Sequence, residues 1–296
     1  MISKACVDKT RRSNFIKNLI GVFFLFFLIT GSGCATRACF NGRYSGADKI
    51  ASEAKLKKTF IETDPFTLTS YYRFDLPGKP LTVYIEGDGA AWETRRRLSK
   101  DPTPRNPLVL KLASRDPSLN VAYIARPGQY ADRGYPACDP VYWSDSRFSN
   151  TVVESMNRAI DDLLNISRSE GINLIGYSGG AAIAALIASR RQDVLSLTTI
   201  AGNLDSEAVS KYHNVSPMTN SLNPIDEAYL LKALPQRHFV AAKDRIIPRT
   251  VAESFVDSAG NPACAQIIII EDATHTDGWI ENAIVFYQQP NLARNK

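Results

Sequence analysis

The sequence predicts an α/β fold in which one mostly parallel central sheet is covered by helices on both faces. The first observation is that short apolar runs of strand length alternate with longer amphipathic stretches of helical spacing. The second is a Gly-Tyr-Ser-Gly-Gly segment, residues 176–180, that joins one such run to an Ala-rich helical pattern. The third is that the roughly 230 residues after residue 65 are enough to bury one core. Alternation of this kind favours parallel strands linked by helices.

The predicted strands are short runs rich in β-branched and aromatic residues. They are residues 68–74, 81–85, 121–125, 173–177, 195–201, 238–242 and 267–270. The clearest predicted helix is the stretch 151–166, whose apolar residues recur at helical spacing. A polar, helix-compatible stretch, 47–59, precedes the first strand. We therefore expect 65–290 to form the α/β domain and 34–64 to be a tether or an N-terminal helix.

The N-terminus has the composition of a signal peptide, which we assign to residues 1–33. These residues hold five Lys/Arg and one acidic residue, so they carry +4 of the chain's formal charge of +5 and leave about +1 for the rest. The basic balance therefore does not indicate a nucleic-acid-binding face. The apolar run 19–30 has twelve residues, fewer than the roughly 20 that span a bilayer comfortably. An uncleaved N-terminal anchor is the alternative.

The segment that ends this region, Thr-Gly-Ser-Gly-Cys at 30–34, resembles a bacterial lipoprotein cleavage site with Cys34 as the acylated first residue of the mature chain. It departs from that pattern at Gly31, where lipoprotein signals usually have Leu. Ordinary cleavage nearby by signal peptidase is the alternative. In either case we expect an exported protein of the cell envelope, facing the periplasm on a lipid anchor or soluble in that compartment.

Ser178 has the sequence context of a nucleophile at a strand-to-helix turn. An apolar run enters the turn and an Ala-rich helical pattern leaves it. The flanking glycines let strand, turn and helix approach closely. Gly179 can offer its N–H to an oxyanion at the helix N-terminus. The alternative is a Gly/Ser loop that matches this pattern by chance.

A nucleophilic serine needs a base, and the chain contains three histidines. His213 lies in a polar, turn-rich stretch, and His238 lies inside an apolar strand-like run. His275 follows the β-branched run 266–270 and two acidic residues, so we expect it in a loop beyond the carboxyl end of a buried strand. Chemistry in an open α/β sheet is placed at such loops. His275 is the predicted base, and a plain polar loop residue is the alternative.

The third residue of a triad is a carboxylate that orients the imidazole and stabilises its charged form. Asp244 follows the strand-like run 237–242 directly and is the preferred acid. Asp205 is a competitor after the preceding strand, but its position before Ser206 and Glu207 is also typical of a helix N-cap. The chain order Ser, Asp, His favours Asp244.

The chain resembles the α/β-hydrolase superfamily in the segments GYSGG around Ser178, KDRIIP around Asp244 and ATHTDGW around His275. The resemblance covers most of the chain after residue 65, and it implies that these residues are nucleophile, acid and base. The segments EGDGAAW, ARPGQY, CDPVYWSDSRFS and AGNLD also resemble those of an uncharacterised group of bacterial α/β-hydrolase-like lipoproteins. This second resemblance supports the fold and the triad and implies no substrate.

In that superfamily a second oxyanion donor comes from the loop after an early strand, often within a His-Gly segment. The corresponding loop here reads Glu86-Gly87-Asp88-Gly89, so Glu86 stands where the family has its histidine. The resemblance therefore implies the backbone N–H of Asp88 or Gly87 as the second donor, beside that of Gly179.

Aromatic and basic residues between two predicted strands could shape the substrate site. Tyr130 and Trp143 could form an acyl or aryl binding wall, and Arg126 or Arg147 could meet a substrate carboxylate or phosphate. Tyr177, next to the nucleophile, is assigned to the same site. The alternative is an ordered loop packed by its own aromatic residues, with Arg147 paired to an acid.

The predicted function is that of an exported serine hydrolase that cleaves ester or related acyl bonds of a small-molecule or lipid substrate. Residues 203–234 lie where the superfamily inserts a cap, and about thirty residues are too few for a full lid, so we expect a minimal cap. The sequence shows no metal-binding spacing and no cofactor motif, and we expect no cofactor. The competing class is a non-catalytic surface lipoprotein that uses the fold for binding or assembly.

Overall fold

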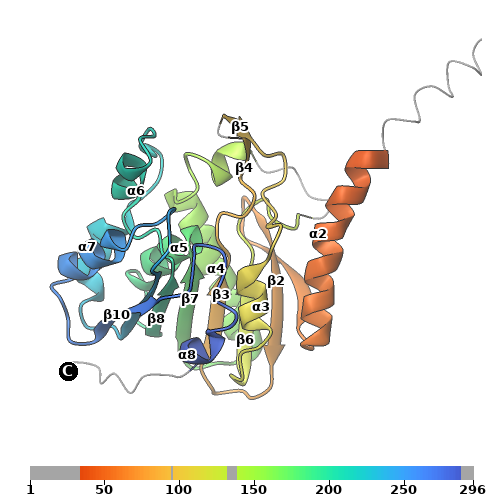
Figure 1. Cartoon of the computed structure of the whole chain (residues 1–296). Helices are drawn as coiled ribbons and strands as arrows, with labels where there is room; N and C mark the ends of the chain where they lie inside the picture. Colours follow the sequence, from red (N-terminus) through yellow and green to blue (C-terminus); the bar gives the residue numbers. More distant parts are fainter. Residues whose placement is uncertain (1–33, 95, 132–138, 288–296) are drawn as a thin grey trace, which may run out of the picture. The chain divides into compact units, whose positions relative to one another are not determined.

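A computed structural model of the chain describes residues 34–94, 96–131 and 139–287 (Figure 1). The predicted signal peptide, 1–33, lies outside the described residues. Contacts divide the chain into two compact units, Met1–Ser45 and Gly46–Lys296. The described part of the first unit is the beginning of helix α2, Cys34–Glu53. No helix among the described residues is long and apolar enough to cross a membrane.

The second unit is built on an eight-stranded sheet in the order β1-β2-β6-β3-β7-β8-β9-β10. The pairs β1–β2 and β2–β6 are antiparallel, and the other neighbouring pairs are parallel. The strands are β1 Lys57–Glu62, β2 Thr67–Phe74, β3 Leu81–Ile85, β6 Asn120–Ile124, β7 Ile172–Tyr177, β8 Val194–Ile200, β9 Gln236–Ala241 and β10 Ala265–Ile270. The predicted α/β fold class is therefore confirmed.

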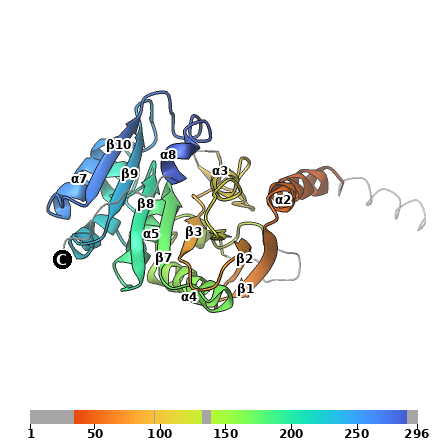
Figure 2. The same cartoon turned by 90° about the horizontal axis from the view of Figure 1, so that it is seen from below.

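Helices cover both faces of this sheet (Figure 2). The amphipathic α4, Asn150–Ser167, and the Ala-rich α5, Gly179–Ala188, lie on one face, and α3, Leu108–Ala113, and α8, Ala283–Tyr287, lie on the other. Strand side chains alternate between the faces. In β3, Leu81, Val83 and Ile85 join the main apolar core with α4 and α5. Tyr84 points the other way, where its hydroxyl donates to Asp116 Oδ2 at 2.7 Å.

The sheet begins earlier than the expected boundary at residue 65. Helix α2 ends at Glu53, and part of the stretch predicted as helical, 47–59, instead belongs to the edge strand β1. The strand is favoured by tertiary pairing, because all six residues of β1 pair with β2. Asp48 links the C-terminal part of α2 to strands β1 and β2, because its Oδ1 accepts a hydrogen bond from the Tyr71 hydroxyl and lies 3.0 Å from Lys58 Nζ.

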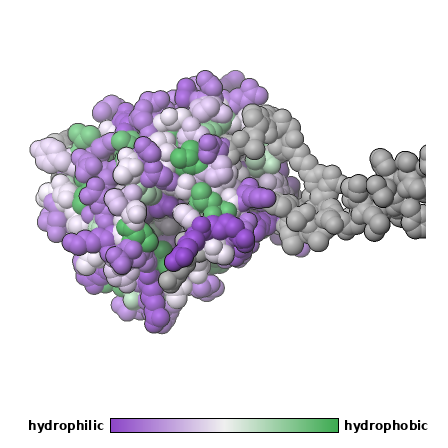
Figure 3. Space-filling view, turned by 90° about the horizontal axis from the view of Figure 1, so that it is seen from above, coloured by the Kyte–Doolittle hydropathy of each residue, from purple (hydrophilic) through white to green (hydrophobic). Residues whose placement is uncertain are grey.

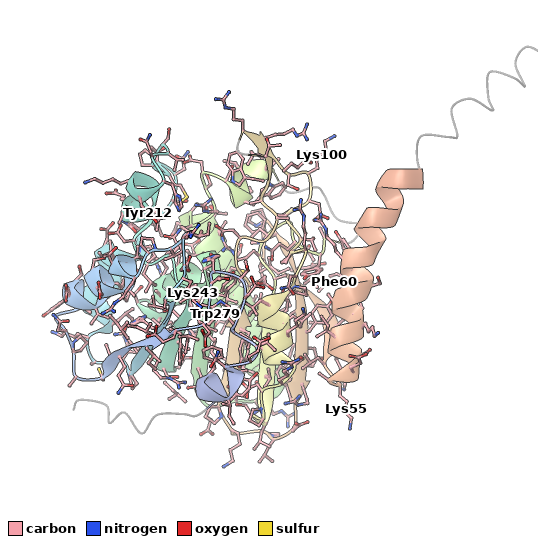
Figure 4. All side chains as sticks on the ribbon, viewed as in Figure 1. Lys55, Phe60, Lys100, Tyr212, Lys243 and Trp279 are labelled. Atoms are coloured by element: carbon pink, nitrogen blue, oxygen red, sulfur yellow. The ribbon has the colours of Figure 1, made fainter. Side chains whose placement is uncertain are left out.

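The carboxyl ends of the parallel strands carry the remaining short elements, at the top of Figure 1. The region expected to be a minimal cap holds α6, Ser206–Tyr212, and a 3₁₀ helix, Pro224–Leu231. A small hairpin, β4 Trp92–Thr94 with β5 Arg97–Leu98, lies at the same end and was not predicted. Figure 4 labels Tyr212, the last residue of α6, and Lys100, two residues after β5. The last long helix, α7, is Thr250–Ser258.

Candidate active site

Ser178 occupies a strained turn between β7 and α5. Its φ of 51° and ψ of −119° lie outside the regions that a non-glycine residue usually adopts. The turn is over-determined by close backbone packing. A Cβ on Gly176 would lie 2.4 Å from the Gly180 carbonyl oxygen, and one on Gly180 would lie 2.3 Å from that of Ile85. Only glycine fits these two positions, so strand, helix and neighbouring loop together hold Ser178 outward.

His275 and Asp244 meet Ser178 in one hydrogen-bonded chain. His275 Nε2 lies 3.1 Å from Ser178 Oγ, and His275 Nδ1 lies 2.8 Å from Asp244 Oδ2. The Asp244 side chain is 1% exposed, and its Oδ1 accepts hydrogen bonds from the N–H groups of Ile246 and Ile247. The carboxylate is thus fixed by its own loop while its second oxygen faces the imidazole. These distances allow proton transfer between Ser178 and His275.

Asp205, the competing acid, has a different role. It is the N-cap of α6, where its Oδ1 accepts from the Ala208 N–H and from Asn223 Nδ2, both at 3.1 Å. Its carboxylate therefore caps α6 and links it to Asn223. His213 is likewise outside the hydrogen-bonded chain, with Nε2 at 2.7 Å from the Ile246 carbonyl. His238 is buried in β9, and burial lowers its pKa to about 4.

Two side chains hold the loop that carries His275. The Tyr177 hydroxyl and Trp279 Nε1 both donate to the His275 carbonyl, each at 2.9 Å. The Tyr177 ring also lies 5.3 Å from the imidazole ring. Figure 4 labels Lys243 and Trp279, which belong to the loops of Asp244 and His275, and these loops are joined where the Lys243 N–H donates to the Ala273 carbonyl.

Tyr177 therefore holds the loop of His275, whereas the sequence analysis assigned it to the substrate site. The role of Trp279 was missed, and the only local signal was its place at the end of the ATHTDGW segment.

The loop after β3 holds the two alternatives predicted for the second oxyanion donor. The Gly87 N–H donates to Glu86 Oε1 at 3.0 Å, so this N–H is already occupied in the structure. The N–H groups of Asp88 and Gly179 have no acceptor among the described residues. Asp88 lies against the turn, since a Cβ on Gly179 would be 1.9 Å from Asp88 Oδ1. Those two N–H groups remain the candidate pair.

Glu86 is a buried acid beside this loop. Its side chain accepts hydrogen bonds from the Gly87 N–H and, at 3.0 Å, from the Tyr123 hydroxyl. Burial raises the pKa of Glu86 to about 7, against the lowering effect of these bonds and of Arg126. Where the superfamily has a histidine, this chain therefore has a carboxyl group that titrates near neutral pH.

Three residues predicted to line the substrate site are buried in the loop after β6. Arg126, Tyr130 and Trp143 are 3%, 1% and 6% exposed, and Trp143 Nε1 donates to the Ser99 carbonyl. Gln129 links this loop to the loop after β3, because its Nε2 donates to the Gly87 carbonyl at 2.9 Å. The burial of these three side chains agrees with the alternative interpretation, in which the loop is packed by its own aromatic residues.

Arg147 is paired to an acid, also as that alternative stated. Its Nε lies 3.3 Å from Asp88 Oδ2, while Arg126 Nη1 lies 3.4 Å from Asp88 Oδ1. Both guanidinium groups face the ring of Phe148 at 5.3 to 5.5 Å. A carboxylate and two cations thus adjoin the side of the Ser178 turn opposite Asp244 and His275.

Figure 3 shows that the face seen from above is hollowed near its centre, with both hydrophilic and hydrophobic residues around the hollow. A separate pocket of about 530 Å³ lies on the other side of the His275 loop. It is lined by residues 276–281 together with α3 and the end of α2, among them Glu53, Lys111 and Arg115. Ser178 does not border this pocket, so it is not the reaction cleft.

Comparison with family models gives no match, and comparison with curated proteins gives none either. Solved structures do match. An acylaminoacyl peptidase from Pyrococcus horikoshii superposes with a TM-score of 0.58 and 12% identity over 79% of this chain and 40% of that one. An α/β serine hydrolase homologue from Coxiella burnetii gives 0.53 and 18% over 81% and 96%. The chain has the α/β-hydrolase fold.

The Pyrococcus furiosus esterase Pf2001 shares this hydrolase fold with a TM-score of 0.57 and 12% identity, over 80% of this chain and 91% of that one. The present chain spans less than half of the length of the P. horikoshii peptidase. Identities this low establish a common fold, and the chemistry must be argued from the site itself.

The buried carboxyl of Glu86 predicts a pH-dependent stability. Folding raises its pKa from 4.5 to about 7, so its contribution to stability is complete below about pH 4.5 and is lost as the pH rises to about 7. Relative to Glu86→Gln, the wild type should lose on the order of a few kcal/mol of unfolding free energy between about pH 5 and 7.5. Urea unfolding at both pH values measures this. Glu62→Gln on the exposed edge of β1 is the control. An equal difference between wild type and Glu86→Gln at both pH values would contradict the assignment.

Proposed function

We propose that the protein is a serine hydrolase that cleaves ester or related acyl bonds, with Ser178 as nucleophile, His275 as general base and Asp244 as the acid that orients it. The observation that carries the proposal is the hydrogen-bonded chain from Asp244 through His275 to Ser178, at a strained turn that holds Ser178 outward. Nucleophile, base and orienting group at these distances are the signature of covalent acyl transfer.

The reaction follows from these positions. Ser178 Oγ attacks the acyl carbon while its proton passes to His275 Nε2, and the carbonyl π electrons move to the oxygen. When the tetrahedral intermediate collapses, the bond to the leaving group breaks and that group takes the proton from His275. Water then attacks the acyl-serine by the same route, releases the acid and restores the Ser178 hydroxyl. Asp244 keeps Nδ1 protonated and stabilises the imidazolium in both half-reactions.

The developing oxyanion needs donors that are unpaired before the reaction. The N–H groups of Gly179 and Asp88 are the proposed donors, since that of Gly87 is bound to Glu86. Gly179 begins α5, so the positive end of the helix dipole adds to its effect. The Asp88 carboxylate beside Gly179 would oppose a negative charge. Its two arginine partners offset that repulsion.

We further propose that the enzyme works in the cell envelope, attached by a lipid on Cys34 and facing the periplasm. The support is the basic and apolar composition of residues 1–33 and the small residues that precede Cys34. The intact hydrogen-bonded chain at Ser178 favours catalysis over the alternative of a non-catalytic binding lipoprotein. A small-molecule or lipid acyl ester is the proposed substrate.

Ser178→Ala should abolish both hydrolysis of 4-nitrophenyl esters and labelling by a fluorophosphonate, because the attacking oxygen is lost. The thermal transition should change little, because among the described side chains Ser178 Oγ is hydrogen-bonded only to His275. Gel fluorescence after labelling and a chain-length series of esters are the measurements. Ser189→Ala, at the far end of α5, is the control and should label normally. Labelling of Ser178→Ala would refute the assignment of the nucleophile.

The two candidate acids are separated by a pair of variants. Asp244→Asn removes the charge that stabilises the imidazolium, so kcat should fall by about 10²- to 10⁴-fold with little change in KM. Asp205→Asn should be much milder, because Asn is about as good an N-cap as Asp. Steady-state kinetics of both variants decide the question. A large loss of kcat in Asp205→Asn together with a nearly normal kcat in Asp244→Asn would reverse the assignment.

The anchor is tested by metabolic labelling of the full-length chain with palmitate in a bacterial host. The wild type and Cys39→Ser should incorporate label, whereas Cys34→Ser should not, because its side chain cannot form the thioether. Release of the Cys34→Ser protein from the membrane fraction is the companion measurement. A wild type that never incorporates label would leave simple secretion or an uncleaved anchor in place of the lipoprotein assignment.

A further inference from the structure

Ion-paired arginines in this protein differ in how completely their guanidinium nitrogens are used. Arg191 has no free nitrogen, since Nε and Nη2 donate to Asp193 and Nη1 donates to Asn157 and Asp161. Arg73 is similar, with Nε on Asp75 and both terminal nitrogens on backbone carbonyls. In these two residues the guanidinium group serves only to join segments of the fold.

Arg147 is held in place but leaves its terminal nitrogens open. Its Nε lies 3.3 Å from Asp88 Oδ2, its guanidinium faces the Phe148 ring at 5.3 Å, and its backbone carbonyl accepts from Arg126 Nη2. Nη1 and Nη2 of Arg147 have no acceptor within residues 34–94, 96–131 and 139–287. The side chain is 19% exposed. Among the described residues, the terminal nitrogens of this guanidinium therefore have no acceptor.

The guanidinium group of Arg147 is linked through Asp88 to the turn of the proposed nucleophile. The ion-pair partner of Arg147 is Asp88. The Oδ1 atom of the same Asp88 carboxylate would lie 1.9 Å from a Cβ on Gly179. A single side chain, Asp88, therefore separates the guanidinium from the turn of Ser178. The loop of Arg147 follows β6, and β3 is the strand between β6 and β7. Arg147 thus lies on the side of Ser178 away from His275.

The charges of this corner leave an excess of positive charge near neutral pH. Arg126 and Arg147 share one carboxylate, that of Asp88. A second acid that acts on Arg126 is Glu86, which is buried and accepts hydrogen bonds from the Gly87 N–H and the Tyr123 hydroxyl. Its pKa is raised to about 7 by burial, so it is only partly ionised there. A ligand that complements the corner carries a negative charge.

We propose that Arg147 binds a carboxylate of the substrate, so that this hydrolase selects esters with a negative charge close to the scissile bond. The planar edge formed by Nη1 and Nη2 matches the two oxygens of a carboxylate, and Asp88 has already ordered it, so little side-chain entropy is lost on binding. The inference rests on the proposed serine-hydrolase function and names a substrate class for it.

The experiment compares charged and neutral esters of the same shape with the full-length protein. One arm uses 4-nitrophenyl hemisuccinate against its neutral methyl ester, which places the charge on the acyl side. The other arm uses 4-acetoxybenzoate against its methyl ester, which places the charge on the leaving group. In at least one arm the wild type should prefer the charged ester, measured as the ratio of the two kcat/KM values.

Arg147→Gln should lower that ratio by about 10- to 100-fold, the effect expected for losing hydrogen bonds to a charged group. Arg147→Lys keeps the charge and the contact with Asp88 but loses the planar edge, so its ratio should lie between those of the wild type and Arg147→Gln. Arg190→Gln is the matched control, because Arg190 is paired to Glu227 near the opposite end of α5 and should leave the ratio unchanged. If Arg147→Gln does not fold, Arg147→Lys alone decides.

The two levels of the argument fail in different ways. A ratio that stays the same in the Arg147 variants, or a wild type that prefers the neutral ester in both arms, overturns the inference while ester hydrolysis itself stands. A wild type that cleaves none of the four esters and whose Ser178 is not labelled by a fluorophosphonate overturns the proposed function instead.

Discussion

The backbone contact between the end of β3 and the start of α5 is the constraint on which the rest of the site depends. A Cβ on Gly180 would lie only 2.3 Å from the Ile85 carbonyl oxygen, and a Cβ on Gly176 would lie 2.4 Å from the Gly180 carbonyl oxygen. This packing forces Ser178 into a positive φ and turns its side chain out of the sheet. It also brings Asp88, in the loop after β3, against Gly179, the first residue of α5.

Two groups of side chains approach the turn from opposite directions along the sheet. The loops after β9 and β10 bring Asp244 and His275 to one side, while the loops after β3 and β6 bring Asp88, Arg126 and Arg147 to the other. Tyr177 links the turn to the first group, since it precedes Ser178 in the chain and its hydroxyl holds the His275 carbonyl. Strand β7 thus helps to set the distance between Ser178 and His275.

The side opposite His275 is unusual in its buried charge. Glu86 is 2% exposed and Arg126 is 3% exposed. Burial favours the neutral form of each group, so it raises the pKa of Glu86 to about 7 and lowers the pKa of Arg126 to about 10. Burying such groups destabilises a fold unless they are paired and hydrogen-bonded. Perturbed groups of this kind cluster at functional sites. Recognition of a substrate carboxylate, as proposed above, would be a functional reason for keeping charged groups buried here.

The sequence by itself determined the fold class and the positions of seven strands, because periodicity and length are local properties that survive into the folded state. It also singled out Ser178, Asp244 and His275, because each follows a recognisable strand in the same kind of sheet. Only the tertiary structure decided which polar groups were already occupied. The Gly87 N–H is taken by Glu86, Asp205 caps α6, and the aromatic residues Tyr130 and Trp143 are buried. Those outcomes depend on contacts between segments far apart in the chain, and strand β1 depends in the same way on pairing with β2.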